Sequence, residues 1–186
     1  MIKSFFAVLL LMCACGAMIV SGGEEKKKEA PDQSSPPLRT IDELRKAAYE
    51  RMDKDAIFYS KEERVEIEKL YQFWKTRKGK ERQAIAITLL RRFPKANRTG
   101  CTLYLLALDN ARQKRIDLLK QVIQNHSDCW FGNGMQVGAT ARYHLIRILM
   151  ETGKQEEAEQ YREELKTLFP DAVDGIGKRF SELLKD

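Results

Sequence analysis

The sequence has few of the residues and motifs on which enzyme active sites are usually built. Its 186 residues include only two histidines, His126 and His144. It contains no Gly-x-Ser-x-Gly nucleophile elbow, no His-Glu-x-x-His zinc motif and no P-loop. Acidic pairs such as Glu156-Glu157 are best explained as the solvated face of a helix. These absences predict a protein that is not an enzyme and that binds no cofactor.

Stretches with the alternating pattern of a β-strand are also missing. Apolar residues recur instead at three- and four-residue spacing, as in amphipathic helices. Two capping boxes, Thr40 with Glu43 and Ser60 with Glu63, mark the starts of the first two helices. Helices are expected at about 40–55, 60–78, 80–93, 101–110, 112–125, 141–152, 154–169 and 173–184. The predicted fold class is therefore all-α.

One stretch, Ala141–Pro170, resembles a tetratricopeptide repeat. Gly153 stands where that family has its turn glycine, Ala158 where it has a close-packing alanine, and Pro170 where it has its terminal proline. The resemblance implies a short right-handed α-solenoid of helical hairpins over residues 40–186. A scaffold of this kind binds another protein or a peptide, here through the inner helices of its groove.

The first twenty-odd residues have the pattern of an export signal. Lys3 precedes a long apolar run, and Cys15 stands in that run between Ala14 and Gly16. This arrangement resembles a bacterial lipobox, which implies lipidation of Cys15 and a place in the cell envelope, facing the periplasm from the outer membrane. Two alternatives remain open: cleavage near Ser21 without lipid, or retention of the run as a short membrane anchor.

The three parts of the chain differ in composition. Residues 1–22 form the signal and lipobox segment. Residues 23–39 are rich in Gly, Pro, Ser and mixed charge, lack apolar periodicity and are expected to be a disordered linker. Residues 40–186 form the helical-repeat domain.

The folded part contains two cysteines, Cys101 and Cys129. They are expected at the same end of one helical hairpin, which favours a disulfide in an oxidising compartment. The alternative is a metal site that combines both cysteines with His126 and His144, but their spacing lacks a paired Cys-x-x-Cys signature. We therefore predict the disulfide and no metal site.

The segment Ser127–Gly138 lengthens the last repeat and breaks its period. Insertions of this kind map to loops that often bind partners. The expected binding residues in this segment are Trp130, Phe131, Asn133 and Gln136. In the alternative interpretation the segment is a structured crossover in which Trp130 covers the core. Its glycine spacing is not a dinucleotide fingerprint, and nucleotide binding is excluded.

Positive charge gathers in the middle of the chain. Residues 75–120 contain thirteen Lys and Arg but only three acids. The predicted basic patch comprises Lys75, Arg77, Lys78, Lys80, Arg82, Arg112, Lys114 and Arg115. It suggests a second possible function, the binding of an anionic glycan or lipid headgroup, unless these residues are ordinary exposed helix faces. Export makes nucleic acid a poor partner, so another envelope protein or peptide is the expected one.

Overall fold

The computed structural model describes residues 37–185, and the regular elements in this range are helices. They are α1 (Ile41–Asp53), the short 3-10 helix η1 (Lys54–Ile57), α2 (Lys61–Thr76), α3 (Gly79–Arg92), α4 (Asn97–Leu108), α5 (Arg112–Asn125), α6 (Val137–Glu151), α7 (Gln155–Leu168) and α8 (Phe180–Leu183). Within this range only two isolated bridges have β geometry. The all-α prediction is confirmed.

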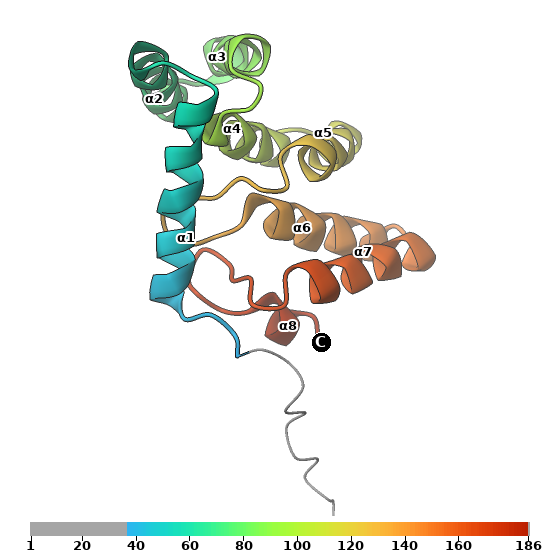
Figure 1. The fold of residues 1–186 in the computed structure, drawn as a ribbon. Coiled ribbons are helices and arrows are strands. Elements are labelled where there is room, and N and C mark those ends of the chain that lie inside the picture. The colour runs from blue at the N-terminus through green and yellow to red at the C-terminus, as the bar shows by residue number, and fades with distance from the viewer. Residues whose placement is uncertain (1–36, 186) are drawn as a thin grey trace, which may run out of the picture. The chain divides into compact units, whose positions relative to one another are not determined.

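Helices α2 to α7 form three antiparallel hairpins, which are layered one on another (Figure 1). Helix α2 packs on α3, α4 on α5, and α6 on α7. The hairpins contact each other through α3 with α4 and through α5 with α6. The short turns of the hairpins therefore lie at one end of the layers, and the longer connections lie at the other end.

Local sequence signals account for the helix ends. Both predicted capping boxes are present, with the Thr40 and Ser60 side chains accepting the backbone N–H groups of Glu43 and Glu63. Gly153 takes a φ of 74°, and the N–H of Lys154 reaches back to the Leu149 carbonyl at 2.9 Å. This geometry closes α6 and turns the chain into α7.

The largest core lies between the second and third hairpins. Leu119 and Val122 of α5 and Leu145 and Leu149 of α6 are almost completely buried there. Ala158 of α7 is also fully buried, and its small side chain lets α7 lie close to its neighbours. The predicted close-packing role of this alanine agrees with its position.

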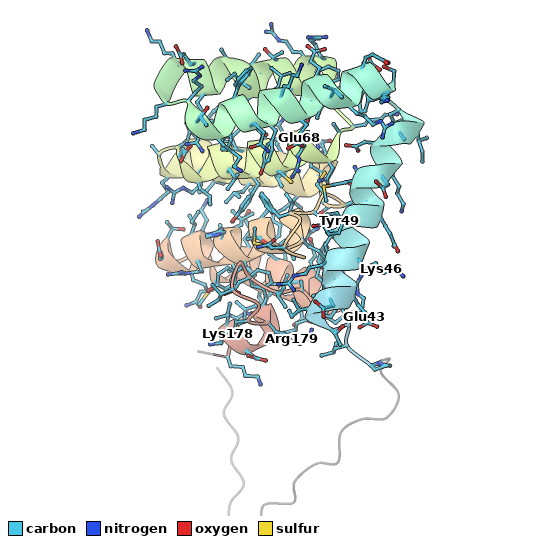
Figure 2. All side chains as sticks on the ribbon, turned by 90° about the vertical axis from the view of Figure 1, so that its left-hand side faces the viewer. Glu43, Lys46, Tyr49, Glu68, Lys178 and Arg179 are labelled. Carbon is cyan, nitrogen blue, oxygen red and sulfur yellow. The ribbon has the colours of Figure 1, made fainter. Side chains whose placement is uncertain are left out.

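Helix α1 lies across the end of the layers where the long connections run (Figures 1 and 2). Leu44 and Ala48 are fully buried and pack against Trp130 and Val173, which belong to two different connections. The opposite side of α1 carries exposed residues such as Lys46 and Tyr49 (Figure 2). Helix α1 therefore bridges segments that are far apart in the chain.

Four predicted boundaries are wrong. Helix α4 begins at Asn97 and α6 begins at Val137, each four residues before the expected start. The closing helix was expected at 173–184, but only Phe180–Leu183 is helical because Gly177, with a φ of 91°, belongs to a tight loop. The linker was expected to reach residue 39, but Arg39 bonds to Asp171 through Nε at 2.5 Å and through Nη2 at 3.1 Å. Arg39 is thus already part of the folded unit.

None of the helices in residues 37–185 is both long and apolar enough to cross a bilayer. The predicted signal and lipobox segment, including Cys15, and the first part of the predicted linker lie outside the described residues.

Candidate functional site

The connection after α5 and the connection after α7 have the same backbone structure. In the first, the Phe131 N–H bonds to the Met135 carbonyl at 2.9 Å and Trp130 bridges to Gln136. In the second, Asp174 bonds to Lys178 at 2.9 Å and Val173 bridges to Arg179. We call the segments 126–136 and 169–179 the first and second loops.

The sequence carries a signal for this repetition that the spacing of apolar residues does not show. In each loop an aspartate is followed, at the same spacing, by a Gly-x-Gly motif. The first loop has Asp128 with Gly132 and Gly134, and the second loop has Asp171 with Gly175 and Gly177. The second glycine of each pair has a φ of 91°. Such a backbone favours glycine, so the motif determines the loop conformation.

Helix α1 and the segment before it dock on both loops through arginine–aspartate pairs. Arg51 donates from Nε to the Asp128 carboxylate at 2.7 Å. Arg39 binds Asp171, and its guanidinium lies 5.5 Å from the centre of the Trp130 ring. Burial opposes ionisation of Asp171, but the hydrogen bonds from Arg39 outweigh burial and lower its pKa. The Arg51–Asp128 pair therefore holds the first loop to α1, and the Arg39–Asp171 pair holds the second loop to the segment before α1.

Arg51 also organises the start of α4. Its Nη1 donates to Asp55 at 2.8 Å and its Nη2 donates to the Lys95 carbonyl at 3.2 Å. Asp55 in turn accepts the backbone N–H of Asn97. Burial raises the pKa of Asp55 above its usual value, and the hydrogen bonds from Arg51 and Asn97 offset only part of this rise. Because Arg51 and Asp55 are both buried, this ion pair is a fixed structural element and not a surface contact.

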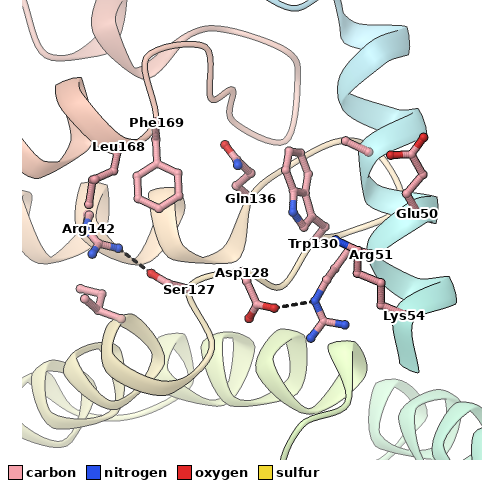
Figure 3. A pocket seen from close by; sticks show the side chains of 12 residues that line it. Glu50, Arg51, Lys54, Ser127, Asp128, Trp130, Gln136, Arg142, Leu168 and Phe169 are labelled. Carbon is pink, nitrogen blue, oxygen red and sulfur yellow. Dashed lines mark hydrogen bonds and ion pairs between the residues drawn. The ribbon is translucent and has the colours of Figure 1, made fainter. Parts of the chain in front are cut away.

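A cleft of about 570 Å³ opens between α1 and the first loop (Figure 3). One wall is formed by Ala47, Glu50 and Arg51 of α1 and by Lys54, the first residue of η1. The other wall and the floor come from the first loop and the ends of α5, α6 and α7, with Ile123, Ser127, Asp128, Trp130, Gln136, Arg142, Leu168 and Phe169. The cleft thus combines apolar, aromatic and charged side chains.

Arg142 holds the floor of the cleft in place. It donates to Glu164 at 2.8 Å, to the Ser127 hydroxyl at 2.8 Å and to the Gly138 carbonyl at 3.1 Å. Its guanidinium also lies 5.0 Å from the centre of the Phe169 ring. With its side chain bonded to three groups, Arg142 positions the walls of the cleft.

Gln136 is a buried polar side chain of the cleft with an atom that has no partner among residues 37–185. Its Oε1 atom is buried and has no hydrogen bond to any of the described residues. The residue as a whole is only 9% exposed. The amide lies between the rings of Trp130 and Phe169 (Figure 3). The matching residue of the second loop, Arg179, is satisfied by the carbonyls of Asp171 and Arg39. The first loop alone therefore has a buried carbonyl without a partner, which is costly, and the amide must turn into the cleft before a ligand can donate to it.

The rim of the cleft supplies apolar surface and charge. Leu168, the last residue of α7, is 61% exposed at the mouth. Lys54 is exposed and forms no ion pair among residues 37–185. A ligand with an N–H donor for Gln136 and an apolar side chain for Leu168 and Phe169 matches this arrangement.

The residues of the predicted recognition segment take different places. Trp130 is 8% exposed and packs under α1, and Phe131 packs edge-on against Tyr104 with ring centres 5.8 Å apart. Asn133 accepts the Met135 N–H and stabilises the loop itself. This placement fits the alternative of a structured crossover. Of the four predicted binding residues, Trp130 and Gln136 line the cleft, and Phe131 and Asn133 do not.

Cys101 and Cys129 are both buried as free thiols, so the structure does not contain the predicted disulfide. They do come to the same place: the Cys101 thiol donates to the carbonyl of Trp130 at 3.3 Å, next to Cys129. A Cβ on Gly100 would lie 2.5 Å from the Cys129 sulfur, so glycine is needed there. Burial raises the pKa of Cys101 to about 12 and that of Cys129 well above its usual value.

The two histidines do not join the cysteines in a metal site. Across the described part of the chain, no three His, Cys, Asp or Glu side chains come together in a way that could hold a metal ion. His144 packs against the rings of Tyr104 and Tyr143 instead. Burial lowers the pKa of both histidines and keeps them neutral.

The predicted basic patch lies at the hairpin turns, the end of the layers away from α1. Its residues belong to the last turn of α2, the first turn of α3, the first turn of α5 and the connection between α2 and α3. Of these residues, Arg77 and Arg82 are paired with Glu81 and Asp109. The patch is therefore separate from the cleft under α1.

Comparison of the chain with protein-family models, with curated proteins and with solved structures gives no match. The geometry of the cleft and of the helical layers therefore carries the functional argument.

Proposed function

We propose that this chain is an exported, lipid-anchored scaffold of tetratricopeptide-like repeats that binds a segment of another cell-envelope protein. It has no catalytic role in this proposal. The three layered hairpins support a short α-solenoid, as do the left-handed Gly153, the buried Ala158 and the end of α7 just before Pro170. Stacked hairpins of this kind present their ends and inner helices to partners.

The cleft beneath α1 is the binding site in this proposal, and the buried Oε1 of Gln136 is the observation that carries it. An extended peptide has backbone N–H groups that satisfy such an acceptor. Its apolar side chains would cover Leu168 and Phe169, which the free protein leaves at the mouth of the cleft. Removal of this apolar surface from water favours binding.

A displayed peptide library tests the site. Peptides enriched on the full chain are synthesised, and their affinity is measured by fluorescence anisotropy for the wild type, Leu168→Lys and the control Ile87→Lys. The side chains of Leu168 and Ile87 are 61% and 40% exposed, so neither change disturbs the core. We expect Leu168→Lys to weaken binding about tenfold or more, the loss typical of a binding hot spot, and Ile87→Lys to leave it unchanged. Equal affinity for both variants, or no enrichment, contradicts the proposal.

The lipid anchor has its own test. The full-length chain is expressed in a Gram-negative host, and the intact mass of the mature form is measured. A mass that fits cleavage before Cys15 plus attached lipid supports the anchor. A mass that fits cleavage near Ser21 without lipid contradicts it and leaves a soluble periplasmic scaffold.

A further inference from the structure

The structure divides the cations of residues 75–120 into two groups. Several are neutralised by acids of neighbouring helices. Arg98 pairs with Glu68 and Lys120 pairs with Glu157, at 2.8 and 2.7 Å. Arg92 forms a two-pronged pair with Glu66. The excess positive charge in this part of the sequence is therefore not spread evenly over the surface.

The second group gathers at the hairpin turns. Five exposed cations there form no ion pair with any residue in the range 37–185: Lys75, Lys78, Lys80, Arg112 and Lys114. Elsewhere in the segment, Arg91 is exposed and has no ion pair with the described residues, and the Lys95 ammonium lies over the Phe58 ring at 4.6 Å. The unneutralised charge is concentrated at one end of the fold.

Contacts between the turns bring these cations together. Arg82 of α3 binds Asp109 at 2.6 Å. Arg115 of α5 donates to the carbonyls of Leu108 and Asn110 at 3.0 and 3.1 Å. The start of α3 and the start of α5 therefore flank the same α4–α5 turn. Between α3 and this turn lies a cleft of about 430 Å³, whose lining includes Lys78, Lys80, Arg82 and Asp109.

The charge distribution is unfavourable for the protein alone. The first turn of α5 holds Arg112, Lys114 and Arg115, contains no acid and has no side-chain cap. Cations at this end of a helix are repelled by its dipole and by each other. Helices α1, α2 and α7 begin instead with pairs of acids. Anions in contact with the turns would offset this repulsion.

We infer that the turn end, defined by Lys75, Lys78, Lys80, Arg112 and Lys114, docks on a membrane surface of anionic phospholipids. One phosphate headgroup is seated in the cleft beside Lys78 and Lys80, and the other cations meet neighbouring headgroups. Phe73 in the last turn of α2 is 53% exposed, with the Arg77 guanidinium 6.0 Å from its ring centre. An exposed aromatic ring beside cations suits the polar–apolar boundary of a bilayer. This inference does not depend on the cleft beneath α1.

Vesicle sedimentation of the full chain tests this inference. The probes are phosphatidylcholine vesicles with and without phosphatidylglycerol, so that any attachment through the N-terminal segment appears equally in both. The test variant carries K78Q, K80Q, R112Q and K114Q. The matched control carries K61Q, R64Q, K69Q and R91Q, which remove the same charge from exposed sites away from the turns. Circular dichroism confirms that both variants are folded.

We expect the wild type to prefer the anionic vesicles and to lose that preference steeply as salt is added. Each cation near an anionic surface strengthens binding about fivefold, so the test variant should lose at least about tenfold while the control keeps most of the preference. Equal losses in both variants, or no preference in the wild type, overturn the inference. Binding to heparin without binding to the anionic vesicles would also overturn it, in favour of a glycan. Peptide binding beneath α1 should be the same in both variants, which separates this test from the proposed function.

Discussion

The carboxylate of Asp55 accepts the backbone N–H of Asn97 with both of its oxygens, at 3.1 and 3.0 Å. A residue of η1 thereby caps the first turn of α4, a role that Ala96, directly before α4, cannot perform with its own side chain. The same carboxylate neutralises the buried Arg51. The start of the second hairpin and the docking of α1 therefore depend on one side chain.

Replacement of Asp55 by alanine should destabilise the protein by about 3–5 kcal/mol, because it leaves the Arg51 charge buried with less compensation and α4 without its cap. Guanidinium unfolding measures this change. Asp53→Ala is the matched control, since Asp53 is exposed and makes no side-chain cap. Its effect should stay within about 0.5 kcal/mol. Similar losses in both variants would contradict the role given to Asp55.

A side chain at the second glycine of the first loop should destabilise the protein. A Cβ on Gly134 would lie 3.1 Å from the Leu44 Cβ and 3.2 Å from the Arg45 nitrogen, and the φ of 91° adds strain. Gly134→Ala should therefore cost about 1–3 kcal/mol and loosen α1. Gly177→Ala has the same φ but meets Ile41 only at 3.6 Å, so it isolates the strain. Thermal unfolding should show the larger loss for Gly134→Ala; the reverse order would argue against close docking of α1 on the first loop.

The two thiols should be unreactive in the reduced, folded protein. Cys101 and Cys129 are 0% and 1% exposed, and burial raises the pKa of both, which suppresses the reactive thiolate. Alkylation followed by mass spectrometry should modify them only after unfolding in denaturant. Rapid modification under native conditions would contradict the burial.

Stability should fall as the solution becomes mildly acidic. Burial lowers the pKa of His126 and of His144 below the usual value of 6.5. Between the lowered folded pKa and 6.5, the unfolded chain binds more protons than the folded chain, so acid favours unfolding and stability is fully present above 6.5. Guanidinium midpoints at about pH 7.5 and about pH 5.5 measure the effect. The double variant His126→Asn, His144→Asn should show a smaller difference, and an unchanged difference would assign it to other groups.

The helices were predictable because their signals are local. The capping boxes at Thr40 and Ser60 and the turn at Gly153 are set by neighbours a few residues away. The cleft was not predictable, since it depends on pairs such as Arg51 with Asp128, 77 positions apart. Burial of Trp130 under α1 has the same cause, because nothing in the loop sequence states what covers it.

The shape of the second loop was predictable in principle. Residues 171–177 repeat the Asp and Gly-x-Gly pattern of residues 128–134, and that repetition is a better guide than apolar spacing. A helix was expected over 173–184. The φ of 91° at Gly177 and the Asp174 carboxylate, which accepts the N–H groups of Ile176 and Lys178, stabilise a loop over the first part of this range instead.

Site-specific photo-crosslinking in the source organism tests most directly whether the cleft beneath α1 holds a segment of a partner protein. A photoreactive amino acid replaces Leu168 at the mouth of the cleft, and in a matched strain it replaces the exposed Ile87 of α3. We expect a discrete adduct at position 168, absent at position 87, whose crosslinked peptide is apolar and belongs to an envelope protein. No adduct at 168, or the same adducts at both positions, would contradict it.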